Sequence, residues 1–167
     1  MDSYIKDMIL YHQAKGEKIA AKRYIIQYLE DDLSTDERIF AYENLINYHF
    51  EDKNLDDFYT TYDVLYYHYF ERHYEEKLHN LEYLKIQMLV YENRYEEAIE
   101  LIKTVLNSPN LSDELQVILA TMIIDIYIEI NDLKRASIFD AQYADLAKKV
   151  THTTKNSLLT VFSAIWL

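Results

Sequence analysis

The sequence contains no cysteine, one glycine and one proline among its 167 residues. Without cysteine the chain can form no disulfide, no thiolate metal site and no cysteine nucleophile. Glycine-rich phosphate loops and tight hairpin turns depend on glycine, and they become improbable when it is this scarce. Average proteins contain about 7% glycine and about 5% proline. The composition therefore predicts a chain that is helical almost throughout.

Long apolar runs and clustered basic residues are also missing. No run reaches the ~18 apolar residues that a membrane span requires, and no basic segment precedes an apolar stretch as in a signal peptide, so we expect a cytoplasmic protein without a membrane partner. The 29 acidic and 17 basic residues give a net charge of −12. Because nucleic-acid binding depends on clustered Lys and Arg, we expect no direct nucleic-acid contact and a neutral or basic protein or peptide partner. Acidity also serves solubility alone.

The stretch 93–109, NRYEEAIELIKTVLNSP, shows the clearest helical pattern. Its apolar residues recur every three or four positions, which is the spacing of one helix face. Asn93 and Tyr95 stand at its start, Ala98 follows as a small residue, and Pro109 ends it. This combination predicts the second helix of a helical hairpin.

The same pattern recurs along the chain when Ala98 is used as an anchor. Three further anchors are Ala21, Phe58 and Ala136, and the four are separated by 37, 40 and 38 residues. Five residues before each anchor stands a candidate turn residue: Gly16, Lys53, Asn93 and Asn131. The register predicts helical pairs at about 2–30, 35–70, 76–107 and 112–150, with a further helix at 157–167. It also requires the helix that begins near residue 55 to end at a break near 72–75.

Tyr95, Ala98 and Pro109 resemble the second helix of a tetratricopeptide repeat. The resemblance implies an all-α fold: an α-solenoid of about four helix-turn-helix pairs plus a C-terminal helix, in a single domain over 1–167. An up-down helical bundle is the alternative. Phe58 departs from the pattern at a small-residue position, and Lys18 departs at the aromatic position. The chain is also similar to the peptide-sensing C-terminal domains of Gram-positive Rgg-type pheromone regulators, without their DNA-binding domain.

In tetratricopeptide proteins the first helix of each pair lines a groove, and this resemblance implies a set of groove residues. A polar residue stands eleven positions before three of the anchors, and each has a neighbour one turn earlier on the same face. Amide and carboxylate side chains there could pair with the backbone of a bound peptide. The alternative is an ordinary solvated helix face. The predicted binding residues are Asn47, Gln87, Asp125, Glu43, Tyr83 and Thr121.

A second candidate surface is the tyrosine-rich helix at 55–70. Its aromatic residues extend around more of the helix than one buried face needs, and tyrosine suits interfaces because it joins apolar area to a hydroxyl. Core packing is the alternative. The helix at 157–167 could cap the last repeat or dock on another subunit. The predicted interface residues are Tyr59, Tyr62, Tyr66, Tyr67 and Trp166.

Catalytic and metal-binding patterns are weak. Glu76 and His79 have the Glu-x-x-His spacing of di-iron bundles, but those require a second copy. The run Asn110–Leu111–Ser112 has the form of a glycosylation sequon, which matters only in a secreted protein. We expect no metal, no cofactor and no enzymatic activity.

These observations favour a non-catalytic protein- or peptide-binding module, such as a regulatory adaptor or sensor domain. Two alternatives stay open. One is a homodimeric assembly protein that uses the tyrosine-rich and C-terminal helices. The other is an acidic, phage-type inhibitor of a host regulator or nucleic-acid-binding protein, which predicts a contiguous acidic face.

Overall fold

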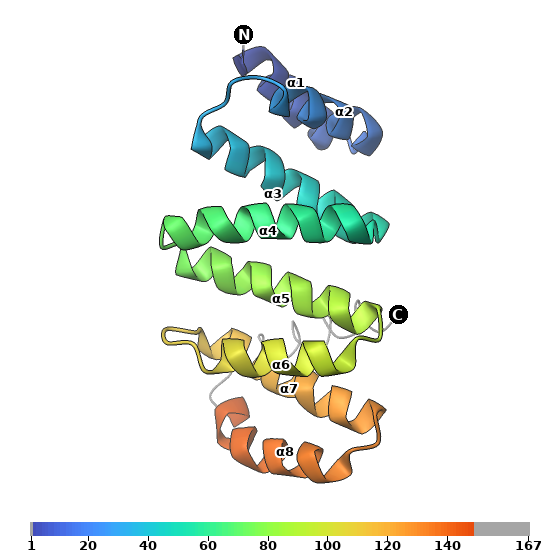
Figure 1. The fold of residues 1–167 in the computed structure, drawn as a ribbon, viewed down its shortest axis with the longest axis vertical. Helices are drawn as coiled ribbons and strands as arrows, with labels where there is room; N and C mark the ends of the chain where they lie inside the picture. Colours follow the sequence, from blue (N-terminus) through green and yellow to red (C-terminus); the bar gives the residue numbers. More distant parts are fainter. Residues whose placement is uncertain (1, 149–167) are drawn as a thin grey trace. The chain divides into compact units, whose positions relative to one another are not determined.

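The computed structural model describes residues 2–148, which form eight α-helices and no strand (Figure 1). The all-α prediction is confirmed. None of the helices in this range is long and apolar enough to cross a bilayer. The predicted helix at 157–167, with Trp166, lies outside the described residues. The helices are α1 Asp2–Ala14, α2 Lys18–Leu29, α3 Thr35–Asp52, α4 Leu55–Glu71, α5 Glu75–Tyr91, α6 Tyr95–Leu106, α7 Asp113–Glu129 and α8 Leu133–Lys148.

The chain divides into two compact units, Met1–Tyr74 and Glu75–Leu167, here called the N-terminal and C-terminal units. In the N-terminal unit, α2 packs against α1 and α3, and α4 packs against α3. In the C-terminal unit, α6 packs against α5 and α7, and α8 packs against α7. Each unit therefore holds two consecutive helical hairpins, as the repeat register requires. The single domain over 1–167 stays a prediction.

The four hairpin turns share one backbone conformation. The predicted turn residues are all left-handed, with φ values of 72° at Gly16, 55° at Lys53, 60° at Asn93 and 61° at Asn131. In each turn the amide of the following residue donates to the carbonyl five positions earlier, a hydrogen bond typical of the Schellman motif that ends helices. These bonds are Glu17 to His12, Asn54 to His49, Arg94 to Leu89 and Asp132 to Tyr127. The structure thus contains a fourfold repeat of the same turn at the predicted positions.

The anchor residues lie three positions into the second helix of each hairpin and are all buried. Three are alanines, which let the two helices approach closely. The exception, Phe58, is also fully buried, and its ring packs 6.1 Å from that of Phe50 and 5.2 Å from that of Tyr59. The N-terminal unit therefore accommodates a large residue at this anchor position by packing it within an aromatic cluster.

The predicted break near 72–75 is confirmed. The helix α4 ends at Glu71, and His73 adopts a left-handed φ of 56°. The amide of Tyr74 then donates to the carbonyl of Tyr69 at 2.9 Å, repeating the bond of the hairpin turns. A local turn thus ends the tyrosine-rich helix without glycine or proline.

Side-chain caps fix the starts of two helices. Ser34 and Glu37 form a capping box, in which each side chain accepts the backbone amide of the other at 3.2 Å. The hydroxyl of Tyr28 donates to the same Glu37 carboxylate at 2.9 Å and so joins α2 to the start of α3. At the start of α7, Ser112 accepts from the amide of Leu115. Each serine thus satisfies a backbone amide that the first turn of its helix leaves exposed.

Candidate functional site

The six predicted binding residues fall into two groups. Glu43 and Asn47 belong to α3 of the N-terminal unit, whereas Tyr83, Gln87, Thr121 and Asp125 belong to α5 and α7 of the C-terminal unit. Each group is described within its own unit.

In the N-terminal unit the two predicted residues differ in their surroundings. Glu43 is half-buried and interacts with Tyr69 of α4: burial raises the pKa of the Tyr69 hydroxyl, and the charge and hydrogen bond of Glu43 raise it further. Asn47, one turn later, is exposed. Glu43 therefore has a structural partner, and Asn47 is a surface residue.

The tyrosines of α4 divide between core and surface. Tyr62 is only 5% exposed, so it belongs to the core and its assignment to a partner surface is wrong. Tyr59 is half-buried. Tyr66 stacks on Phe70 with the rings 6.4 Å apart and 9° from parallel, and Tyr67 and Phe70 are 60% and 61% exposed. An exposed aromatic surface thus remains toward the end of α4.

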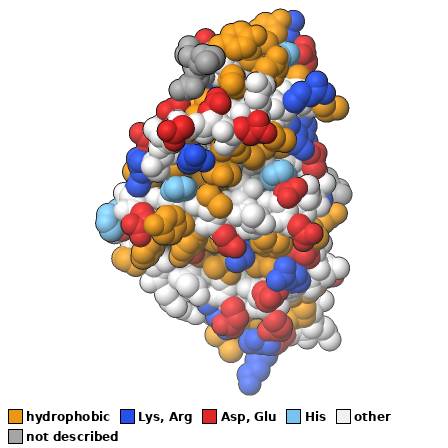
Figure 2. Space-filling view, turned by 45° about the horizontal axis from the view of Figure 1, so that its top comes forward, with side chains coloured by type: hydrophobic (Ala, Val, Ile, Leu, Met, Phe, Trp, Pro, Cys, Tyr) orange, Lys and Arg blue, Asp and Glu red, His pale blue; other side chains and the backbone are white. Residues whose placement is uncertain are grey.

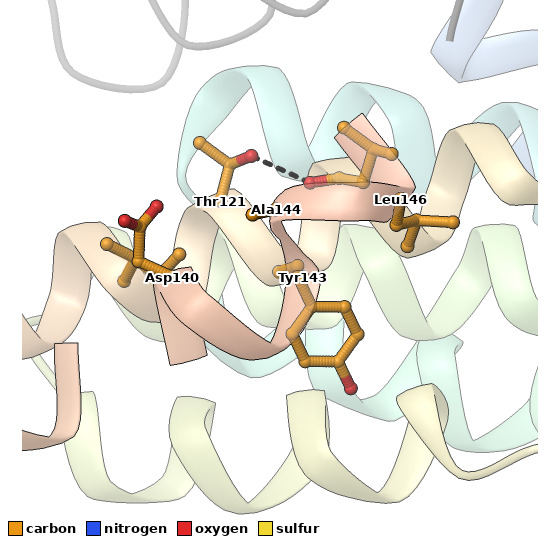
Figure 3. Close-up of a pocket in the computed structure, with 8 residues that line it drawn as sticks. Thr121, Asp140, Tyr143, Ala144 and Leu146 are labelled. Carbon is orange, nitrogen blue, oxygen red and sulfur yellow. Dashed lines mark hydrogen bonds between the residues drawn. The ribbon is translucent and has the colours of Figure 1, made fainter. Parts of the chain in front are cut away.

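Thr121 lies in a small cavity between α7 and α8 (Figure 3). Its hydroxyl donates to the carbonyl of Val117 at 2.8 Å, so the side chain is satisfied within its own helix. The cavity holds about 70 Å³ and is lined from α8 by Asp140, Tyr143, Ala144 and Leu146. This volume suits a water molecule or two rather than a peptide side chain.

Gln87 and Asp125 are half-buried. Neither side chain forms a hydrogen bond or ion pair with any residue from 2 to 148. Burial raises the pKa of the Asp125 carboxyl. Both residues are thus polar groups whose hydrogen-bonding capacity is unused within the described chain.

Tyr83 lines a larger cleft between α5 and the start of α7, here called the acidic cleft. It holds about 440 Å³. The N-terminal half of α5 forms one wall, and the α6–α7 connection and the first turns of α7 form the other. The lining residues are Glu75, Glu76, His79, Asn80, Tyr83, Asn110, Ser112, Glu114, Leu115 and Ile118.

The charge of the acidic cleft is of one sign. Glu75, Glu76 and Glu114 contribute carboxylates, and none of the described residues lining it is Lys or Arg. Their positions follow from local rules, because acidic residues in the first turn of a helix are stabilised by its dipole. Asn110 donates from Nδ2 to Oε2 of Glu75 at 3.3 Å and holds the α6–α7 connection against α5.

Two further polar side chains of this wall, His79 and Tyr83, form no hydrogen bond within the described part of the chain. His79 is 8% exposed and forms no hydrogen bond or ion pair within the described part of the chain. The hydroxyl oxygen of Tyr83, one turn further along α5, is buried and also lacks a partner there. Burial raises the pKa of this hydroxyl to about 12, so it stays protonated. The two groups add unused hydrogen-bonding capacity to the carboxylates of the cleft.

A second groove, between α5 and α6, differs in its electrostatics. It holds about 470 Å³ and mixes the basic residues Lys85 and Arg94 with three glutamates. Arg94 forms ion pairs with both Glu97 and Glu92. Because its basic residues offset its acidic ones, this groove has no comparable unbalanced charge.

Metal-binding geometry is absent from the described residues, where no group of three His, Asp or Glu side chains could hold an ion. Sequence reasoning found Tyr83 but missed most of the acidic cleft. Glu76 and His79 were considered as metal ligands, Asn110 as part of a sequon, and Ser112 as part of that sequon and as a helix cap. The spacing of Glu76, His79 and Tyr83 could have indicated one wall of the cleft, because these three residues share a helix face.

The four left-handed turns and four buried anchors show a repeated helical hairpin, and no comparison links the chain to tetratricopeptide-repeat proteins. No comparison links the chain to Rgg-type regulators. No protein-family model, curated protein or solved structure matches it significantly.

Proposed function

We propose that the chain is a non-catalytic, cytoplasmic binding module that holds a segment of a protein partner in the acidic cleft. The observation that supports this function is the cleft itself: three carboxylates without an opposing basic residue among the described lining residues, beside the His79 side chain, which forms no bond within that part of the chain, and the buried Tyr83 hydroxyl. A regulatory adaptor or sensor needs such a recognition site and no catalytic group.

The size and chemistry of the acidic cleft suit a peptide. Its volume of about 440 Å³ falls within the range of about 300–1,000 Å³ typical of ligand pockets. A buried polar group without a partner costs about 1–3 kcal/mol, so a ligand that pairs with the Tyr83 hydroxyl recovers part of that cost. Gln87 follows Tyr83 by one turn and could extend the contact to a peptide backbone.

Selection from a displayed library of random twelve-residue peptides tests this function. Enriched peptides would be titrated calorimetrically into the full chain and into the double variant Glu76→Gln, Glu114→Gln. We expect the double variant to weaken binding by about tenfold, the effect of losing roughly 1.4 kcal/mol. The matched control, Glu96→Gln with Glu100→Gln, removes the same charge from the α5–α6 groove and should leave affinity unchanged. Failure to enrich any peptide, or equal losses in both variants, would contradict the function.

The exposed aromatic surface of α4 favours a second candidate function, homodimeric assembly. Tyr67 and Phe70 together present apolar area of the kind enriched at interfaces. Light scattering over a hundredfold range of concentration tests it, with the variant Tyr67→Ser, Phe70→Ser as comparison. A constant monomeric mass in the wild type rules this assembly out.

The acidic-inhibitor alternative requires a contiguous acidic face. On the face shown in Figure 2, acidic side chains are interspersed with hydrophobic and basic ones. That face therefore gives the alternative no support.

A further inference from the structure

We propose that the acidic cleft recognises a guanidinium group, and thus that the bound segment presents an arginine side chain to Glu76, Glu114, His79 and Tyr83. This inference rests on the proposed function and names the chemistry that the cleft selects. It commits to one occupant, an arginine of a protein or peptide partner.

The carboxylates alone do not carry this inference. Glu75, Glu76 and Glu114 stand in the first turns of α5 and α7, where the helix dipole already favours acidic residues. The second observation is His79, which is more than nine-tenths buried, lines the same cleft and has no partner among residues 2–148. Its ring nitrogens can therefore bond a group that enters the cleft.

The ligand is an organic cation rather than a metal ion. The described His, Asp and Glu side chains nowhere converge in a group of three that could coordinate a metal. The carboxylates instead come from opposite walls of the cleft, Glu76 from α5 and Glu114 from α7. Such a separation suits an extended cation with several donors.

Guanidinium fits this arrangement better than ammonium does. Its five N–H donors lie in one plane and can bond acceptors on two sides at once. The acidic cleft offers carboxylate oxygens on both walls. A guanidinium plane also stacks on aromatic rings, which His79 and Tyr83 provide. A lysine ammonium has three donors around a strongly hydrated point and uses fewer of these groups.

The inference is tested with a small probe that needs no prior peptide selection. Nα-acetyl-L-arginine N-methylamide would be titrated into the full chain while the ring resonances of His79 are followed by NMR. We expect saturable shifts with a dissociation constant on the order of 1 mM, typical for so small a ligand. The citrulline analogue has the same shape without the charge, and we expect it to bind at least about tenfold more weakly, because charge-assisted hydrogen bonds are about twice as strong as neutral ones. The affinity of the lysine analogue should lie between those of the arginine and citrulline probes.

Two double variants test whether the arginine probe binds in the acidic cleft. The double variant Glu76→Gln, Glu114→Gln should weaken the arginine probe by about tenfold or more, whereas Glu96→Gln with Glu100→Gln should not change its affinity. Absence of a saturable shift at His79, equal binding of the citrulline analogue, or equal effects of the two double variants would overturn the inference.

The outcomes separate this inference from the proposed function. Enriched peptides that lose binding in the Glu76→Gln, Glu114→Gln variant but tolerate replacement of arginine by citrulline would retain the function and overturn the inference. An arginine probe that shifts His79 while the library yields no peptide would support the cleft chemistry and contradict the peptide-binding function.

Discussion

The side chain of Asn110 donates to Glu75 across 3.3 Å and joins the α6–α7 connection to the first turn of α5. Asn110 is also left-handed, with φ of 62°. One residue thus serves both the turn and the wall of the acidic cleft, and two substitutions separate these roles.

Asn110→Gly should destabilise the C-terminal unit only slightly, by less than about 1 kcal/mol, because the turn is kept and only an exposed hydrogen bond is lost. Asn110→Ala should cost roughly 1 kcal/mol more, since alanine is disfavoured in the left-handed region. Urea unfolding measures both. Equal stability of the two variants would show that the turn conformation does not depend on this residue.

The first hairpin turn gives a similar test in the N-terminal unit. Gly16 has φ of 72°, and a Cβ there would meet nothing within 4 Å. Gly16→Ala should therefore lower the free energy of unfolding by about 1 kcal/mol, with no contribution from steric overlap. The left-handed backbone strain of alanine lowers this free energy, and the lower entropy of the unfolded chain offsets part of the loss. The counterpart is Asn131→Gly at the equivalent turn, which should stay within about 0.5 kcal/mol of wild type. A loss in thermal unfolding for Asn131→Gly as large as that for Gly16→Ala would contradict the shared role.

Much of the fold could be predicted from local sequence. Turns and caps depend on residues close together in sequence, as at Gly16, Asn131 and Ser34. Their positions can therefore be predicted without knowledge of the tertiary structure. No glycine or proline marks the break at His73, which was predicted from the repeat register and from the excessive length of an unbroken helix.

The acidic cleft was harder to predict because it depends on tertiary packing. Glu76 and Asn110 are far apart in sequence, and only the folded α6–α7 connection brings them to one cleft. Tyr83 was found through its register, but Thr121, at the equivalent position of the next repeat, lines a different cavity. A shared register therefore does not give a shared site.

The anchor positions differ in the volume they need. Phe58 is fully buried among Phe50 and Tyr59, so Phe58→Ala should cost about 3–5 kcal/mol through lost burial and a cavity. Ala98→Leu, at the equivalent position of the C-terminal unit, should cost about 1–3 kcal/mol through overpacking. Asp63→Ala, at an exposed position of α4, is the control and should change the free energy of unfolding by less than about 0.5 kcal/mol. A mild effect of Phe58→Ala would mean that α3 and α4 close around the smaller residue.

The last prediction concerns Glu82, a carboxyl group in α5 that is 7% exposed and that sequence reasoning did not single out. Burial raises the pKa of this group, and the positive charge of Lys85 opposes the rise. In the unfolded chain a glutamate titrates near its ordinary pKa of about 4.3. Because the folded state keeps its proton to higher pH than the unfolded state does, stability falls as pH rises from the unfolded pKa to the folded one.

Glu82→Gln removes this titration while keeping the shape of the side chain. Near pH 4 the variant and the wild type should have similar stability, and above the folded pKa the variant should be more stable by at least about 1 kcal/mol, because it no longer buries a charge. Urea unfolding between pH 4 and pH 8 measures the difference. Glu100→Gln, at an exposed position of α6, should show no comparable gain. If the advantage of Glu82→Gln were the same at every pH, the effect would come from packing, because only a titrating carboxylate links stability to proton concentration.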